Sequence, residues 1–130
     1  MEVDSARILK KMHERIIKEF MDVIILAKLR DGPASGYDVI SLIDKRFHIL
    51  MSPGTVYSML YSLERQQLVE GSWSARKRVY RLTDQGRKVI ETIVQHNYVP
   101  IFTELTRDPD EKGCTATREN TIFCGAKPRI

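Results

Sequence analysis

The sequence lacks the long apolar segments that membrane and secreted proteins carry. Its longest apolar run, residues 23–27, falls far short of the roughly 20 residues of a membrane-spanning helix and is soon followed by Lys28 and Arg30. The N-terminus is acidic, with Glu2 and Asp4, and shows no basic segment followed by an apolar one, as a secretory signal would. We therefore expect a cytoplasmic protein without membrane contacts.

Metal-binding and catalytic constellations are also scarce. The three histidines, His13, His48 and His96, are scattered without ligand spacing, and nine residues separate Cys114 from Cys124. We expect reduced cysteines in a cytoplasmic chain, with a disulfide within or between chains as the alternative. No nucleophile with its base, paired carboxylates or phosphate-binding glycine loop is recognisable. The sequence therefore predicts a protein that is not an enzyme and has no metal or cofactor.

The chain does contain enough apolar material for a core and a localised excess of positive charge. Hydrophobic residues make up 42% and charged residues 29% of 130 residues, which is typical of one folded domain with an appendage rather than of a disordered chain. Residues 53–88 hold seven basic and three acidic side chains, whereas the rest holds fourteen of each sign. The whole net charge of +4 thus lies in this segment. Such a patch suits a polyanionic partner, although ordinary solvated charge is the alternative.

Apolar periodicity and capping residues predict three helices in the first half of the chain. The first begins after Ser5, whose hydroxyl can cap it, and continues to a stop signal at residues 31–33. Ser35 caps the second helix, and Ser52 caps the third, with Pro53 at its first position, where a missing N–H costs nothing. The apolar residues expected to face the core are Tyr37, Ile40, Ile43 and Phe47 in the second helix, and Val56, Met59, Leu60 and Leu63 in the third.

After the third helix the period of the apolar residues changes to that of strands. Residues 68–73 and 79–82 are rich in apolar and aromatic side chains, and the polar, basic residues 74–78 between them are typical of a hairpin tip. We interpret Trp73, on the first strand, and Tyr37, in the second helix, as core aromatics.

Three helices followed by a basic hairpin have the layout of a winged helix, whose third helix enters the major groove of DNA. Phosphates would repel an acid on that helix, and no carboxylate occurs between Lys45 and Glu64. Hydroxyl groups and arginine bond to phosphates and base edges, and a helix N-terminus offers free N–H groups to a phosphate. A plain surface helix is the alternative. The residues expected to contact DNA are Ser52, Thr55, Tyr57, Ser58, Tyr61, Ser62, Arg65, Arg76, Lys77 and Arg78.

The two ends of the helical region carry more apolar surface than one small domain can cover. Thr83 caps a fourth helix, which Pro100 should kink or restart. A contiguous exposed apolar surface usually marks a contact with a partner, so we expect a two-fold dimer built from the terminal helices. The residues expected at its interface are Ile8, Leu9, Met12, Ile16, Val94, Tyr98, Ile101, Phe102 and Leu105.

The stretch from Phe20 to Ile90 resembles the winged-helix domain of the PadR-like transcriptional regulators. The residues that carry the resemblance are Gly36-Tyr37-Asp38-Val39-Ile40, Ser52-Pro53-Gly54-Thr55-Val56-Tyr57, Leu60, Leu63-Glu64, Leu68, Trp73 and Tyr80-Arg81-Leu82-Thr83-Asp84-Gln85-Gly86. The resemblance implies a dimeric, repressor-like protein with its third helix in the major groove and its wing over the backbone or minor groove. It also implies a small aromatic or drug-like effector near the dimer interface as a possible ligand.

The chain departs from this family's pattern at three places. Ser58 stands where the family usually has proline, and Ser62 where it often has arginine. The segment from Trp73 to Tyr80 is shorter than usual and has no Gly-Arg-Pro type of tip, although residues 76–78 keep the positive charge. The docking mode therefore transfers better than the operator sequence, which the residues do not give.

Taken together, the patterns predict a mainly α chain with a small β-hairpin (α+β), a winged helix-turn-helix with flanking dimerisation helices. The expected parts are an N-terminal helical extension (1–16), the DNA-binding domain (17–95), the end of a dimerisation helix (96–106) and a polar, cysteine-containing tail (107–130). We expect a sequence-specific DNA-binding transcriptional regulator that acts as a repressor. The alternative is a winged-helix protein-interaction module in a larger transcription or replication assembly, which would show Leu or Phe on the exposed third helix.

Overall fold

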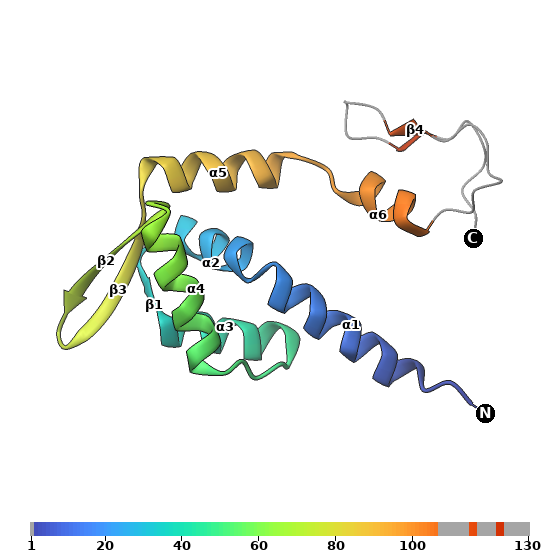
Figure 1. The fold of residues 1–130 in the computed structure, drawn as a ribbon, viewed down its shortest axis with the longest axis horizontal. Coiled ribbons are helices and arrows are strands. Elements are labelled where there is room, and N and C mark those ends of the chain that lie inside the picture. Colours follow the sequence, from blue (N-terminus) through green and yellow to red (C-terminus); the bar gives the residue numbers. More distant parts are fainter. Residues whose placement is uncertain (1, 107–114, 117–121, 124–130) are drawn as a thin grey trace. The chain divides into compact units, whose positions relative to one another are not determined.

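A computed structural model of the chain describes residues 2–106, 115–116 and 122–123 (Figure 1). The chain divides into two units, residues 1–90 and 91–130, and each is described by itself. The elements of the first unit are α1 (Ser5–Glu19), α2 (Met21–Arg30), β1 (Ala34–Ser35), α3 (Gly36–Phe47), α4 (Pro53–Arg65), β2 (Val69–Ser74), β3 (Lys77–Leu82) and the start of α5 (Asp84–Gln95). The second unit holds the end of α5, α6 (Val99–Thr106), β4 (Thr115–Ala116) and β5 (Ile122–Phe123).

The core of the first unit lies between α2, α3, α4 and the hairpin. The predicted inward stripe of α4 is confirmed for Val56, Leu60 and Leu63, which are fully buried. Each such side chain stabilises the fold by about 1.5–3 kcal/mol relative to an exposed position. The other fully buried side chains are Met21, Ile25 and Leu26 of α2, Val39 and Ile43 of α3, Val69 of β2 and Ile90 of α5.

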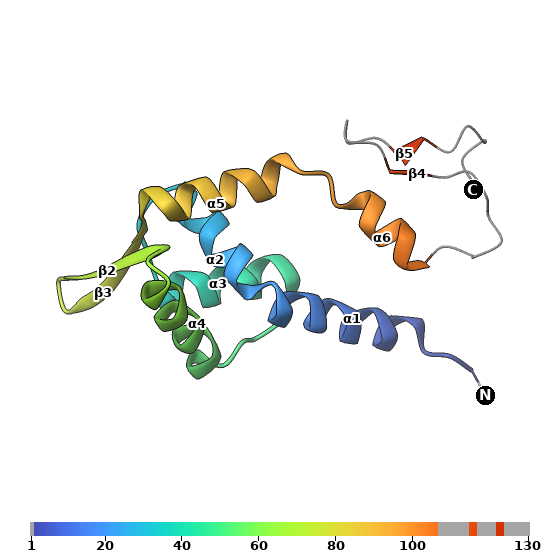
Figure 2. The same ribbon diagram turned by 45° about the horizontal axis from the view of Figure 1, so that its top comes forward.

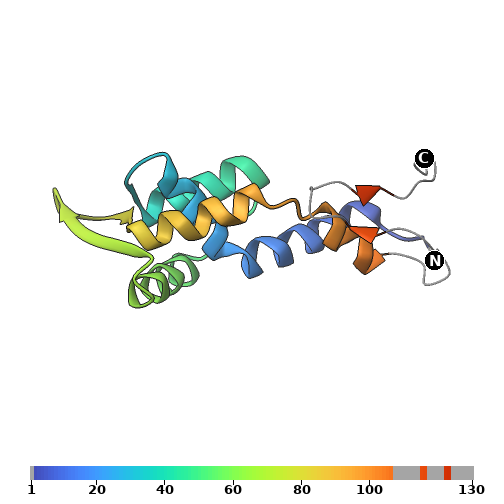
Figure 3. The ribbon, with the colours of Figure 1, turned by 90° about the horizontal axis from the view of Figure 1, so that it is seen from above.

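The hairpin β2–β3 extends clear of α3 and α4 (Figures 2 and 3). We call residues 69–82 the wing. Its turn consists of Ala75 and Arg76, which both have positive φ, 47° and 66°. Two such residues match the twist of the flanking strands, so the tip is two residues rather than the predicted five. The sheet has a third strand that the sequence did not predict, because β1 pairs with β3 over only Ala34 and Ser35.

Helix boundaries agree with the capping signals at most positions. The hydroxyls of Ser35, Ser52 and Thr83 accept backbone N–H groups of α3, α4 and α5, respectively, as predicted. Pro100 lies in the first turn of α6, which begins at Val99 after α5 has ended at Gln95, so the helix restarts there as expected. Helix capping is a local effect, and this explains why neighbouring residues were enough to predict it.

The predicted N-terminal helix differs from the structure in two places, its cap and a break at Phe20. Asp4 caps it by accepting the N–H of Arg7 at 3.2 Å, so Ser5 lies inside the helix rather than at the cap. Aspartate is as good a cap as serine, which left the sequence ambiguous. The helix also breaks at Phe20, whose φ of −105° and ψ of 26° separate α1 from α2. Nothing in the local sequence explains this break.

Three aromatic residues expected in the core are exposed instead. Tyr37 is 66% and Trp73 71% exposed, and Phe47 at the end of α3 is 40% exposed. Gly36 and Val39 take the buried face of α3, which turns Tyr37 outward. Trp73 sits next to the end of β2, beyond the reach of the core. Aromatic size alone therefore did not indicate burial.

Within the described part of the chain, no helix has both the length and the hydropathy to cross a membrane. The same residues include no group of three or more histidine, cysteine or acidic side chains arranged to hold a metal ion. Cys114, Cys124 and most of the tail lie outside the described residues, so the predictions on them stay predictions.

Candidate nucleic-acid interface

The outward face of α4 presents hydroxyl groups from the start of the helix onward. The hydroxyl of Ser52 accepts the N–H of Thr55 at 3.2 Å and lies 3.0 Å from its side-chain oxygen. These contacts fix the first turn, where backbone N–H groups are not used within the helix. An open hollow of about 560 Å³ follows this face and is lined by Ser52, Gly54, Thr55, Ser58, Met59 and Ser62. The structure thus brings seven of the predicted contact residues onto one helix or its cap, and four of them, Ser52, Thr55, Ser58 and Ser62, line this hollow.

Tyr61 and Arg65 continue this outward face toward the end of α4. Tyr61 is 62% exposed, and the guanidinium carbon of Arg65 lies 5.9 Å from the centre of its ring. Residues four apart on a helix lie one above the other, which explains this contact. Arg65 forms no ion pair among the residues that the structure describes. Its guanidinium therefore remains available to an acceptor outside the chain.

The predicted cations of the wing fall into two groups. Arg76 and Lys77 are exposed at the turn. Arg78 instead donates to both carboxylate oxygens of Glu64, at 2.8 and 2.9 Å. Hydrogen bonding to Glu64 is the main cause that raises the pKa of Arg78 above its ordinary value, so the guanidinium stays charged. Arg78 therefore already has an anionic partner inside the domain.

Tyr57 lies on the flank of α4 rather than on its outward face. Its ring packs against Gly36, where an added Cβ would come within 2.6 Å of the ring, and it meets Tyr37 edge-on at 6.4 Å. Burial raises the pKa of the Tyr57 hydroxyl. Glycine at position 36 thus allows α4 to approach the start of α3. DNA contact by Tyr57 and by Arg78 stays a prediction, and both side chains have partners within the domain.

Two residues near this surface were missed by the sequence reasoning. Tyr37 was assigned to the core but is exposed beside Tyr57, at the start of α3. Glu64 was treated only as the end of an acid-free stretch. The one sequence signal near Tyr37 was the capping box of Ser35 and Asp38. These two residues exchange hydrogen bonds and so fix the start of α3, where Tyr37 lies. The backbone N–H of Ser35 is the main cause that lowers the pKa of Asp38. Glu64 had no such local signal.

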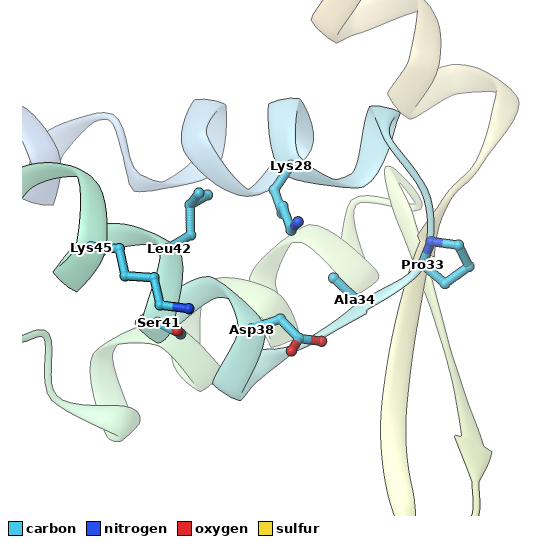
Figure 4. A pocket seen from close by; sticks show the side chains of 7 residues that line it. All are labelled: Lys28, Pro33, Ala34, Asp38, Ser41, Leu42 and Lys45. Carbon is cyan, nitrogen blue, oxygen red and sulfur yellow. The ribbon is translucent and has the colours of Figure 1, made fainter.

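A second hollow, of about 410 Å³, lies between α2, β1 and α3. In Figure 4 the side chains of Lys28 and Lys45 reach toward this space, and the carboxylate of Asp38 lies beside it. The other lining residues are Pro33, Ala34, Ser41 and Leu42. The hollow combines two ammonium groups with one carboxylate and small or aliphatic side chains.

The apolar stripes predicted to form a dimer interface are exposed in the single chain. On α1, Ile8, Leu9 and Ile16 are exposed and Met12 is half-buried. In the second unit, taken by itself, the exposed residues are Val94, Tyr98, Ile101, Phe102 and Leu105. Both stripes are thus exposed among the described residues, and their part in a dimer stays a prediction.

Comparisons with known proteins agree with this arrangement. A family model described as the transcriptional regulator PadR-like family matches residues 25–92. A curated relative, an uncharacterized 37.1 kDa protein in transposon TN4556 of Streptomyces fradiae, is 34% identical over 70 residues, 53% of this chain. The chain spans only 20% of that protein's length.

Solved structures show the same fold. A PadR-like transcriptional regulator from Bacillus cereus has a TM-score of 0.61 and 22% identity, covering 71% of this chain and 93% of its own. PadR of Bacillus subtilis in complex with operator DNA has a TM-score of 0.51 and 23% identity, covering 57% and 45%. F93 from STIV, a winged-helix DNA-binding protein, has a TM-score of 0.51 and 20% identity, covering 68% and 91%. The family match spans just over half of the chain, and the chain belongs to the PadR-like family of transcriptional regulators.

Proposed function

We propose that the chain is a sequence-specific DNA-binding regulator that acts as a dimer and represses transcription. The observation that carries the proposal is the outward face of α4, where hydroxyl groups and Arg65 are exposed and the single carboxylate of the helix, Glu64, is held at the flank by Arg78. A helix of this composition can approach phosphates and base edges without repulsion. A solved relative in the family is bound to operator DNA, which supports the same docking.

The two parts of the surface have different roles in the proposal. The exposed face of α4 lies in the major groove, where Arg65 can donate two hydrogen bonds to guanine. Arg76 and Lys77, at the turn of the wing, meet phosphates or the minor groove next to it. Their charge supplies affinity that depends on salt and not on sequence. The dimer places two such surfaces on the two halves of one operator.

Repression follows in this proposal from occupancy of the operator, since a protein bound over a promoter excludes other proteins from the same DNA. An effector would act by changing how the two copies are arranged.

The experiment is selection of bound fragments from the source genome, followed by fluorescence anisotropy with the selected duplex and a random duplex. We expect the selected duplex to bind roughly 10³-fold or more tightly than the random one, as specific regulators do. Arg87→Ala is the matched control for Arg65→Ala, because Arg87 is an exposed arginine on α5 within the same basic segment. It should change the binding of both duplexes only slightly.

A rival function is docking to another protein without reading DNA. Its outcome in the same experiment would be weak binding that is equal for all duplexes and disappears at moderate salt. That result would contradict the proposal. Its structural counterpart would be large apolar residues on the face of α4, whereas the residues found there are Thr55, Ser58 and Tyr61.

A further inference from the structure

Glu64 connects α4 to both strands of the wing. It lies in the last turn of α4, seven residues after Tyr57 and on the same flank. Its carboxylate accepts the backbone N–H of Gly71, on β2, at 2.9 Å. It also accepts two hydrogen bonds from Arg78, on β3, at 2.8 and 2.9 Å. One side chain of the helix therefore holds two neighbouring strands.

The contact is closely packed. An added Cβ at position 71 would lie 2.7 Å from Glu64 Oε2 and from Arg78 Nη2, so a side chain there would displace the ends of both residues. The guanidinium of Arg78 also lies 6.0 Å from the ring centre of Trp73 and 5.6 Å from that of Tyr80. Arg78 is thus restrained by a carboxylate on one side and by two aromatic rings, and its direction is fixed.

The value of this contact lies in geometry rather than in Coulomb energy. The side chains of Arg78 and Glu64 are 33% and 29% exposed, and ion pairs at such sites add little to stability. The contact nevertheless fixes orientation, because Arg78 Nη2 donates to both oxygens of Glu64 while the guanidinium lies beside the rings of Trp73 and Tyr80. The wing extends clear of the helices (Figure 2), and Glu64 holds it midway along β2, at Gly71, and near the turn, at Arg78, so this restraint sets the direction of the tip.

We propose that Glu64 and Arg78 form a clasp that fixes the wing relative to α4, and that Glu64 is a positioning residue for DNA binding. This inference rests on the proposed DNA-binding function. In this arrangement Arg78 acts through Glu64 and contacts no phosphate, whereas Arg76 and Lys77 do. The clasp holds the turn of the wing at the spacing that lets it contact DNA while α4 lies in the groove.

The sign of one substitution separates this proposal from simple electrostatics. Removing a negative charge near DNA should tighten binding, because the carboxylate repels phosphates. Loss of the clasp should weaken binding, because the wing must then be ordered when DNA binds. Glu64→Gln keeps the size of the side chain and an oxygen that can accept the Gly71 N–H, but loses the charge that holds Arg78.

The first arm of the test uses the free protein. Trp73 is the single tryptophan of the chain and lies on the wing, so its time-resolved fluorescence anisotropy reports wing motion. We expect Glu64→Gln to increase the fast depolarisation, and Arg76→Ala, the matched control on the turn, to leave it unchanged. Because the guanidinium of Arg78 lies 6.0 Å from the ring centre of Trp73, the fluorescence lifetime is recorded beside the anisotropy decay to separate local quenching from motion. An unchanged decay in Glu64→Gln would overturn the clasp.

The second arm measures affinity for the selected duplex at several salt concentrations. We expect Glu64→Gln and Arg78→Gln each to weaken binding roughly three- to thirtyfold, and the double variant to be no weaker than the weaker single one, as coupled residues behave. The slope of log affinity against log salt should not change in Arg78→Gln. A slope reduced by about 0.9, with unchanged or tighter binding by Glu64→Gln, would show that Arg78 contacts a phosphate and would overturn the proposal.

Thermal melting of each variant distinguishes positioning from loss of the fold. Both arms are measured well below the lowest melting temperature. If Arg78→Gln melts too low, Arg78→Lys replaces it, since lysine keeps the charge but lacks the planar guanidinium that lies beside the rings of Trp73 and Tyr80. Absence of duplex binding by the unsubstituted protein would contradict the proposed function, and the Trp73 measurement would still decide whether the clasp holds the wing.

Discussion

Helices α1 and α4 both expose one face to solvent, but the chemistry of the two faces is opposite. On α4 the exposed residues are hydroxyls and Arg65, and three side chains on the other face are fully buried. On α1 the exposed residues include Ile8 and Leu9, at 53% and 57%, and Ile17 alone is buried. The core therefore holds α4 rigidly with a polar surface outward, as a helix that docks on DNA requires. A helix face on which apolar side chains stay this exposed is typical of a surface that contacts another protein chain.

The largest effect is expected from breaking the apolar side of this comparison. Leu9→Asp should raise the dissociation constant of the dimer at least roughly a hundredfold, because the interface would bury an unpaired carboxylate. Lys10→Asp, which puts the same group on the polar side of α1, should have little effect. Sedimentation velocity at micromolar concentration measures both. A monomeric unsubstituted protein under these conditions would contradict the dimer.

The same test applies to the second unit through Ile101, which is exposed on α6. Ile101→Asp should also give monomers if this stripe takes part in the dimer. A dimer that tolerates Ile101→Asp but not Leu9→Asp would assign the interface to α1 alone.

The polar side of the comparison is tested next, with Arg65→Ala. We expect binding to the selected duplex to weaken by about 1–3 kcal/mol while binding to random duplex is largely spared, if Arg65 reads a base. Arg87→Ala serves as the control of equal charge. A proportional loss on both duplexes would instead show that Arg65 holds a phosphate.

A smaller effect at any one salt concentration is expected at the turn of the wing. Replacing Arg76 and Lys77 with alanine should weaken binding to all duplexes alike and reduce the salt slope by up to about 0.9 for each lost phosphate contact. Anisotropy titrations at four salt concentrations measure the slope. Loss of specificity with an unchanged slope would invert the roles assigned to the wing and to α4.

The smallest effect concerns the N-terminal caps of α3 and α1. Asp38 belongs to a reciprocal box at the start of α3, whereas Asp4 accepts one exposed N–H of α1. Asp38→Ala should lower the free energy of unfolding at pH 7 by about 0.5–1.5 kcal/mol, and Asp4→Ala by less, because α1 is anchored by fewer buried residues. Equal losses in the two variants would contradict this ranking.

The contribution of Asp38 also has a defined pH dependence. Its folded-state pKa lies below the ordinary value of 3.8, so its charged form is favoured by folding. The added stability is present above the unfolded-state pKa and is lost as the pH falls through the lower, folded-state pKa. Urea unfolding of the unsubstituted protein and Asp38→Ala should therefore differ less at acid pH than at pH 7.

Local chemistry explains which parts of the fold the sequence predicted. The caps at Ser35, Ser52 and Thr83 depend on residues within one helical turn, and the inward stripe of α4 depends on spacing alone. Strand β1 could not be predicted, because two residues have no period and its pairing with β3 is a tertiary event. No local pattern indicated that Trp73 is exposed, because tryptophan occurs both near the tip of a hairpin and inside a core.

The candidate site was predictable to the same degree. The helical spacing of the apolar residues in α4 placed Thr55, Ser58 and Tyr61 on its outward face. It could not separate Arg78 from its neighbours, because Arg78 and Glu64 are fourteen residues apart and meet only in the folded domain. Charge counted along the sequence therefore overstates the charge that remains available at the wing.

The turn of the wing carries a consequence for how such a protein can diversify. Ala75 and Arg76 occupy a left-handed backbone conformation that glycine or asparagine adopts more easily, so the chain keeps a cation at a position where the backbone disfavours it. Because residues 72–77 are all exposed, the two residues of the turn can change with little effect on the packing of the domain. Under the proposed function, an exchange of these two residues would change the contact of the wing with DNA and leave α4 as it is.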